Sequence, residues 1–142
     1  MNCPVCKGDK GVMIIVEHER IELDYCNNCA GIWFDYGELD LLLDHLDLDS
    51  SAFSMDTILS LPEKQTKESA RKCPACRQKM KKVMVGTDPE VMIDVCPRAD
   101  GIWFDGGEVQ QVIRQLVDKA PTGTGGEEKI ISFLGEVFKA SD

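Results

Sequence analysis

The sequence predicts a small α+β protein that is stabilised by metal and built from two tandem copies of one unit. Three observations predict this fold. The stretch that begins at Cys26 returns at Cys96, seventy positions later, with Gly-Ile-Trp-Phe-Asp in both copies. The seven cysteines stand mostly in closely spaced pairs. Units of about 50 residues also bury too little apolar surface to fold readily on packing alone, so the cysteines are expected to bind metal.

The repeat divides the chain into four parts. Self-similarity at a fixed distance is the signature of tandem units. The first copy with its helix spans residues 1–48, and the second copy with its helix spans residues 73–119. Residues 49–72 form a linker that is long enough for the two units to reorient. Residues 120–142 hold a Gly-rich break and a C-terminal helix.

The first copy is expected to consist of a knuckle, a hairpin and a second knuckle. Cys3-Pro4-Val5-Cys6 allows two thiolates to converge on one ion. Residues 12–16 are rich in β-branched side chains, and residues 21–25 alternate between apolar and acidic ones. This pattern is typical of a hairpin with one buried face. The hairpin brings Cys26 and Cys29 back beside the first pair.

A helix is expected over about residues 36–48, because leucines recur there at helical spacing with aspartates between them. Asp35 is predicted to be its N-cap, with Glu38 completing a capping box. Trp33 is expected to pack between knuckle, hairpin and helix rather than to form an exposed aromatic anchor.

The second copy repeats this plan. Residues 83–85 and 91–93 predict its hairpin, and a capping box that begins at Asp105 precedes its helix. In the linker, residues 53–59 predict a short helical turn. Apolar side chains over residues 130–138 predict a C-terminal amphipathic helix. That helix could pack on its own protein, pair with a second chain or dock on a partner.

The charge of the chain is acidic and uneven. The formal net charge is -9, and residues 1–50 hold three basic and eleven acidic side chains. Nucleic-acid binding depends on neutralising phosphates, so this half is a poor candidate for it. An acidic docking face and simple solubility are both open interpretations.

The sequence predicts a cytoplasmic location. No apolar run approaches the roughly 20 residues of a membrane span, and the N-terminus does not resemble a signal peptide. In a reducing compartment, closely paired cysteines bind metal more often than they form disulfides.

The four cysteines of the first copy predict structural zinc. Cys3 and Cys6 form one pair, and Cys26 and Cys29 form the second about twenty residues later. Four thiolates make a closed tetrahedral site with no position for a substrate. Oxidation of these thiolates would release the metal, so a redox switch is an alternative.

The second copy leaves its fourth ligand open. Cys73, Cys76 and Cys96 supply three thiolates, but Ala99 stands where Cys29 stands in the first copy. Asp100 offers a carboxylate one residue further on, and carboxylate oxygen is an accepted zinc ligand. A water in that position, or loss of the metal, is the alternative.

No catalytic constellation accompanies these sites, and the chain is predicted not to be an enzyme. A zinc with three protein ligands and a bound water would have the outline of a catalytic site. However, the only histidines are His18 and His45, both in the first copy, and both are expected to be solvated.

The complete motif resembles a known family. Cys-Pro-x-Cys, a hairpin, and Cys-x-x-Cys-x-Gly-Ile-Trp-Phe-Asp-x-Gly-Glu-Leu are similar to the bacterial TFIIB-type zinc ribbon of the transcription factor zinc-finger family. The resemblance covers residues 3–46 and 73–116. It implies that the four cysteines of the first copy are metal ligands. Some members carry Cys-x-x-x-His-Gly at the second knuckle, and Asp100 stands where that histidine would.

These observations predict two tandem zinc ribbons that act as a zinc-binding protein-interaction module, and the family resemblance implies an association with transcription. The expected cofactor is Zn²⁺, one ion in the first ribbon and a second in the other. The expected partner is a protein, with no role for a membrane. One alternative is nucleic-acid binding through a basic cluster in the linker and second copy, formed by Lys64, Lys67, Arg71, Lys72, Arg77, Lys79, Lys81 and Lys82. Another is a labile metal carrier or enzyme at the second site.

Overall fold

The computed structural model describes residues 2–6, 11–18, 20–48, 53–68, 70–86 and 90–119. The expected Gly-rich break and C-terminal helix lie outside these residues. In chain order, the elements are β1 (Ile14–His18), β2 (Ile21–Tyr25), β3 (Ile32–Asp35), α1 (Glu38–His45), α2 (Met55–Ser60), β4 (Lys81–Val85), β5 (Val91–Val95), β6 (Gly101–Phe104) and α3 (Glu108–Lys119).

Both predicted hairpins are confirmed. Strand β1 pairs antiparallel with β2, and β4 pairs antiparallel with β5. In β2, Ile21, Leu23 and Tyr25 are buried while Glu22 is exposed, which gives the one-sided pattern that the sequence predicts. The short helical turn expected in the linker is α2.

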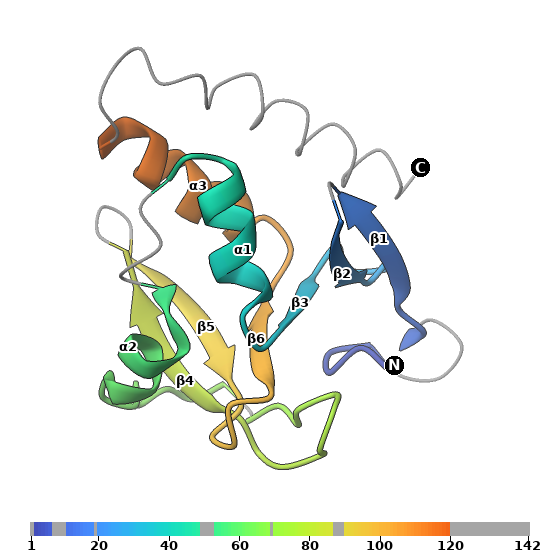
Figure 1. The fold of residues 1–142 in the computed structure, drawn as a ribbon. Helices are drawn as coiled ribbons and strands as arrows, with labels where there is room; N and C mark the ends of the chain where they lie inside the picture. The colour runs from blue at the N-terminus through green and yellow to red at the C-terminus, as the bar shows by residue number, and fades with distance from the viewer. Residues whose placement is uncertain are drawn as a thin grey trace.

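The two copies form one continuous six-stranded sheet, with strand order β1-β2-β3-β6-β5-β4 (Figure 1). The third strands β3 and β6 join the halves in antiparallel register, with Trp33 opposite Trp103. The expectation that the linker lets the units reorient is therefore wrong. Backbone hydrogen bonds and a shared core hold the two copies in one arrangement.

One face of the sheet is covered by helices. Buried leucines of α1 and buried apolar residues of α3 pack into a single cluster with side chains from the strands of both copies. Phe34 of β3 and Phe104 of β6 meet edge to face in this cluster, with ring centroids 5.5 Å apart. This core crosses the boundary between the copies, so burial of apolar surface stabilises both at once.

The opposite face carries the two tryptophans. Successive side chains of a strand point to opposite faces, so Trp33 and Trp103 point away from the helices that cover the phenylalanines. Both indoles are fully buried, among Met13, Met80 and the cysteines of the knuckles. The prediction that Trp33 is a core residue is confirmed, but it packs against the knuckles and not against the helix, because its indole lies on the face of the sheet opposite α1.

Two glycines allow the tryptophans to fit. A Cβ atom on Gly31 would lie closer than 3.0 Å to the ring of Trp103, and one on Gly101 would also lie closer than 3.0 Å to the ring of Trp33. Each copy thus leaves room for the indole of the other copy. This close approach is the physical reason for the Gly-x-Trp spacing in the repeated motif.

The predicted N-caps are not formed by the aspartate side chains. Trp33 Nε1 donates a hydrogen bond to Asp35 Oδ1 (2.9 Å), and Trp103 Nε1 donates one to Asp105 Oδ1 (3.1 Å). The N-cap of α1 is Gly37, without a side-chain hydrogen bond, so α1 begins at Glu38 and not at 36. A buried indole N–H needs an acceptor, and this need outweighs helix capping.

Half of the predicted capping box is present in the second copy. There the backbone N–H of Asp105 donates to Glu108 Oε1 at 2.8 Å.

The part of the linker that follows α2 is fastened to the second copy. The backbone N–H of Lys64 donates to the carbonyl of Lys82 (2.7 Å), and that of Met80 donates to the carbonyl of Arg71 (2.8 Å). The ammonium of Lys81 donates to the carbonyls of Leu59 and Leu61. Lys64 and Arg71 therefore bond the outer edge of the second hairpin, at Lys82 of β4 and at Met80 just before it.

Candidate metal centre

The four cysteines of the first copy converge at one end of its hairpin. Cys3 and Cys6 precede β1, and Cys26 and Cys29 follow β2, so the antiparallel pairing of these strands brings the two knuckles together. Their four Sγ atoms all lie within 4.8 Å of one another. The Sγ atoms of Cys3 and Cys29 are 3.7 Å apart, and those of Cys6 and Cys26 are 3.8 Å apart.

These separations fit a tetrahedral zinc. A Zn–S bond of about 2.3 Å in tetrahedral geometry places two sulfurs about 3.8 Å apart. A disulfide would bring them to about 2.0 Å. All seven cysteines of the chain are free thiols in the structure. The donor set and its spacing therefore suit Zn²⁺ and not a pair of disulfides.

Backbone amides of the knuckles support the thiolates. The N–H groups of Val5 and Cys6 both lie 3.3 Å from Cys3 Sγ, which they approach as donors. In the second copy the N–H of Ala75 donates to Cys73 Sγ at 3.4 Å. Asn28 adds a side-chain donor, 3.0 Å from Cys6 Sγ. Donors aimed at sulfur favour the charged form that a metal ion needs.

The second site consists of Cys73, Cys76, Cys96 and Asp100, again within 4.8 Å of one another. The Sγ atoms of Cys76 and Cys96 are 3.6 Å apart. Asp100 Oδ2 lies 3.4 Å from Cys96 Sγ and 3.8 Å from Cys73 Sγ. For Zn–O and Zn–S bonds of about 2.0 and 2.3 Å, a tetrahedral site predicts a sulfur–oxygen separation of about 3.5 Å.

A change in the second knuckle brings Asp100 into the position of Cys29. In the first copy the residue with left-handed backbone is Ala30, after Cys29 (φ 64°). In the second copy it is Ala99, before Asp100 (φ 63°). The amide of Ala30 donates to the carbonyl of Cys26 four residues earlier, whereas the amide of Ala99 donates to Cys96 three residues earlier. The altered turn compensates for the shift of the ligand by one residue.

At both sites burial disfavours the charged form of thiols, whereas backbone hydrogen bonds at Asn28 and Cys29 lower the pKa of Cys26. Burial raises the pKa of Cys3 to about 11 and that of Cys73 to about 12. Burial also raises the pKa of Cys29 and Cys96. Without a metal these groups would hold protons at neutral pH, whereas a coordinating thiol is deprotonated outright. The pKa of Asp100 is lowered by the thiols of Cys76 and Cys96, so its carboxylate is charged and available.

The histidines take no part in either site. Among the described residues, the groups that could hold a metal are the two that contain cysteines. His45 lies half-buried at the end of α1 and belongs to neither group.

The basic cluster predicted from the sequence is partly committed to internal contacts. Lys82 Nζ lies 2.7 Å from Asp94 Oδ1, and both side chains are buried. Arg71 forms ion pairs with Asp94 (3.5 Å) and with Asp105. This network was not predicted from the sequence. The recurrence of an aspartate at positions 24 and 94 was the available signal.

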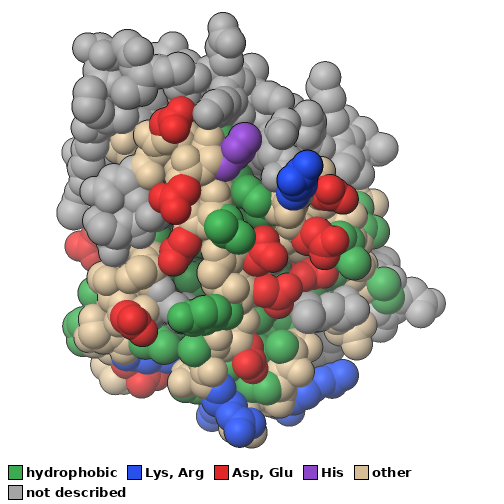
Figure 2. All heavy atoms as spheres, in the orientation of Figure 1, with side chains coloured by type: hydrophobic (Ala, Val, Ile, Leu, Met, Phe, Trp, Pro, Cys, Tyr) green, Lys and Arg blue, Asp and Glu red, His purple; other side chains and the backbone are tan. Residues whose placement is uncertain are grey.

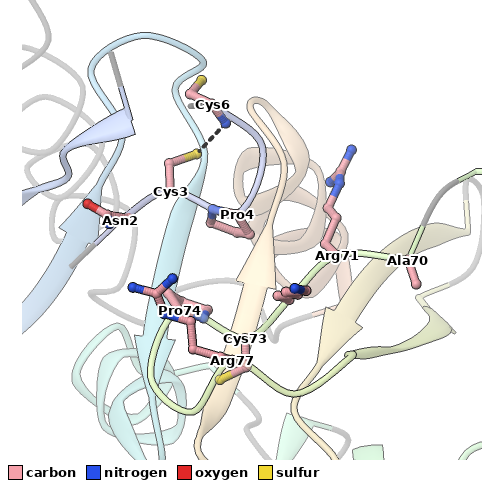
Figure 3. Close-up of a pocket in the computed structure, with 10 residues that line it drawn as sticks. Asn2, Cys3, Pro4, Cys6, Ala70, Arg71, Cys73, Pro74 and Arg77 are labelled. Carbon is pink, nitrogen blue, oxygen red and sulfur yellow. Dashed lines mark hydrogen bonds between the residues drawn. The ribbon is translucent and has the colours of Figure 1, made fainter. Parts of the chain in front are cut away.

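Two other residues of the basic cluster, Lys72 and Arg77, border a cleft between the knuckles of the two copies (Figure 3). It has a volume of about 360 Å³. Its lining includes Lys72 and Arg77, together with Pro4 and Pro74 from the two Cys-Pro knuckles.

Comparison with family models gives an independent finding. The model described as transcription factor zinc-finger, a TFIIB-type zinc ribbon, matches residues 2–45 and 72–115. The two matches cover more than half of the chain, and each contains one of the metal-ligand groups. The chain belongs to the transcription factor zinc-finger family. It holds two tandem zinc ribbons, each with one group suited to Zn²⁺.

Two further comparisons gave no match. Neither the curated proteins nor the solved structures contain one that is sufficiently similar to the chain. Within the described part of the chain, no helix is both long and apolar enough to cross a membrane.

Proposed function

We propose that this protein is a zinc-stabilised protein-interaction module of the cytoplasm that docks on the transcription machinery. Its zinc ligands are Cys3, Cys6, Cys26 and Cys29 in the first copy, and Cys73, Cys76, Cys96 and Asp100 in the second. The observation that carries the proposal is the closed ligand set at each site. The spacing of all four donor atoms suits one tetrahedral ion.

Closed sites support a structural role for the metal. A catalytic zinc keeps one coordination position for water or substrate, whereas a structural zinc has four protein ligands. Asp100 fills the position that would be open in the second copy. This disfavours the alternatives of an enzyme or a labile metal carrier at that site.

The metal supplies folding free energy that the small units lack. Structural zinc binding contributes on the order of 10 kcal/mol in small domains. The shared sheet then turns two metal sites into one rigid body with two knuckles on the same face. A rigid surface of this kind favours binding because little conformational entropy is lost when a partner docks.

The acidic first copy supports a protein partner. Figure 2 shows Asp and Glu side chains spread across one face of the molecule, with Lys and Arg mainly along its lower edge. Such a surface repels nucleic-acid phosphates and attracts basic protein surfaces. The link to transcription rests on the description of the family.

The first test is the number of zinc ions per folded chain, measured by native mass spectrometry. We expect two in the wild type, one in Asp100→Ala, and two in Asp100→Cys. The Asp100→Cys variant should also release zinc from the second site more slowly when a chelator competes. Two ions in Asp100→Ala would show that Asp100 is not needed as a ligand, and would reopen the exchange and catalysis alternatives.

The second test is binding to purified RNA polymerase, measured by biolayer interferometry. We expect zinc-loaded protein to bind and zinc-stripped protein to lose binding. Absence of binding by the loaded protein would remove the proposed link to the transcription machinery.

A second candidate function is nucleic-acid binding at the cleft between the knuckles. The exposed side chains of Lys72 and Arg77 on its lining favour this candidate. Retention of DNA or RNA that weakens with salt, and is reduced by Lys72→Gln and Arg77→Gln, would support it. No salt-dependent retention would exclude it.

A further inference from the structure

The two copies differ most at the outer edges of the shared sheet. Ile15 stands opposite Asp24 in the first hairpin, and Lys82 stands opposite Asp94 in the second. Ile15 and Lys82 therefore occupy the same position in the two ribbons. Lys82 is 4% exposed and Ile15 is 68% exposed.

In the second copy, residues of the preceding linker contact this edge. The backbone N–H of Lys64 donates to the carbonyl of Lys82, and the carbonyl of Arg71 accepts from the N–H of Met80. Arg71 from the same segment reaches Asp94 and Asp105, while Lys82 also pairs with Asp94. The second copy thus shows that basic residues of a neighbouring segment can dock on the edge of a ribbon of this design.

In the first copy, the corresponding edge is open among the described residues. Strand β1 pairs with β2 alone and is the last strand of the sheet. Ile15 occupies the same position in its hairpin as Lys82 does in the other. Its backbone carbonyl therefore points away from β2, as the carbonyl of Lys82 points away from β5. An unpaired edge of this kind is a template for another strand. The exposed apolar side chain of Ile15 lies on it.

The acidic side chains beside this edge lack the cations that their counterparts have. Asp24 and Asp35 correspond to Asp94 and Asp105, but no described Lys or Arg forms an ion pair with either. Glu17 also stands directly opposite Glu22, a like-charge pair that destabilises a sheet.

We propose that β1 and these acidic side chains bind an extended segment of a partner protein that carries Arg or Lys at alternate positions. This proposal deepens the proposed function, because it names where and how a protein partner docks. The segment would add as a strand along β1. One face of an added strand presents every second side chain, which matches basic residues to Asp24 and Asp35. Their aliphatic stems would cover Ile15.

A metal ion does not explain this surface. Among the described residues, the carboxylates of the first copy form no group compact enough to hold a cation. An unpaired backbone edge together with an exposed isoleucine favours a peptide over any small cation.

The test uses the full-length, zinc-loaded chain and a fluorescent decapeptide of alternating Arg and Thr. We expect saturable binding by fluorescence anisotropy, at least tenfold weaker for the double variant Asp24→Asn with Asp35→Asn. Asparagine keeps the shape of each side chain and leaves an oxygen for the indole of Trp33. The control variant, Asp40→Asn with Asp44→Asn, makes the same change of charge on α1 and should bind as the wild type does.

Backbone pairing is tested separately. A peptide with N-methyl groups at alternate residues should lose binding, and NMR shifts on binding of the unmodified peptide should centre on the amides of β1. Equal weakening in the control variant, or shifts centred on the cleft between the knuckles, would overturn the proposal.

If a second copy or the chain's own C-terminal segment pairs with β1 instead, other measurements would show it. Dimers of the chain by analytical ultracentrifugation, broken by Ile15→Arg, would assign the edge to a second copy. Binding only after removal of residues 120–142 would assign it to the chain's own C-terminal segment. Either result would overturn the proposal. Loss of the zinc ions themselves would instead contradict the proposed function, so the two failures are distinguishable.

Discussion

Gly31 and Gly101 show how single residues determine the arrangement of the two copies. Each glycine lies against the indole of the tryptophan in the opposite copy, at a distance that excludes any side chain. The same tryptophans donate to Asp35 and Asp105, which fixes the orientation of each indole. The repeated Gly-Ile-Trp-Phe-Asp motif is therefore a pairing motif as well as a core motif.

Gly31→Ala should destabilise the protein by about 1–3 kcal/mol, because the added methyl group overlaps the ring of Trp103. Urea denaturation of the zinc-loaded protein measures this loss. The control is the same change in a Trp103→Phe background, where the smaller ring leaves space. A loss of equal size in that background would show that the overlap is not the cause.

Glu108 gives the second copy a pH dependence. Burial raises the pKa of Glu108 to about 7, and the nearby Asp105 and Asp94 add to the effect. The folded chain then holds a proton that the unfolded chain releases near pH 4.5, so stability falls as the pH rises towards 7. Above pH 7 the fold carries the full cost of the buried charge.

Glu108→Gln should remove this dependence while keeping an acceptor for the amide of Asp105. We expect the thermal midpoint of the variant to exceed that of the wild type by an amount that grows from pH 6 to pH 8. Glu90→Gln, at an exposed position, is the control. If the difference in thermal midpoint between the variant and the wild type stays constant from pH 6 to pH 8, Glu108 is not the source of the pH dependence.

The cysteine ligands could be predicted from the sequence because their spacing is a local feature of the chain. Two cysteines with two residues between them predict a metal knuckle whatever lies around them. Asp100 could be named as the fourth ligand only with water or loss of the metal left open as alternatives, because its placement depends on the left-handed turn at Ala99, for which alanine gives no signal. The aspartates of the motif were misassigned as caps because their partners, the indoles, are fixed by tertiary packing.

At the scale of the elements, strands β3 and β6 were the main omission. Both have four residues and are buried on consecutive positions, so they lack the alternation that reveals a strand. Their pairing joins residues seventy positions apart, for which local sequence carries no signal. The hairpins β1–β2 and β4–β5 could be predicted because each pairs with its neighbour in the chain.

The linker also differs from its sequence pattern. Polar residues between two units are typical of a flexible connection. Here those residues contribute Arg71 and Glu68 to ion pairs with the second copy, together with a backbone hydrogen bond to Lys82.

Lys82→Met should cost about 3–5 kcal/mol, because it leaves the buried carboxylate of Asp94 without its closest cation. Chemical denaturation measures the effect. The double variant Lys82→Met with Asp94→Leu should recover much of the loss, since an apolar pair replaces the ion pair. Lys79→Met, at an exposed lysine, is the control, and an equal loss there would contradict the explanation.

At the scale of the whole molecule, the structure predicts one cooperative unit. The sheet is continuous across the two copies, and the same apolar cluster contains residues of α1 and α3. A defect in one metal site should therefore weaken both ribbons.

Cys26→Ser in the first copy should speed hydrogen exchange at the amides of β5 in the second, measured by mass spectrometry. Thermal unfolding should remain a single transition at a lower temperature. Val5→Ser, at an exposed position of a knuckle, is the control. Separate transitions for the two halves, with β5 protected as in the wild type, would contradict this prediction.

The pairing of β3 with β6 also has a consequence for the ancestry of the chain. The two strands carry the same motif and face each other with Trp33 opposite Trp103, so a local twofold axis passes between them. Two separate polypeptides, each with one ribbon, could form the same contact as a homodimer. Duplication and fusion of such a gene would keep the dimer and free its halves to diverge. In the chain as it stands, the second copy has Asp100 as its fourth donor and bonds its own edge with Lys64 and Arg71, while the first copy has four cysteines and, among the described residues, an open edge.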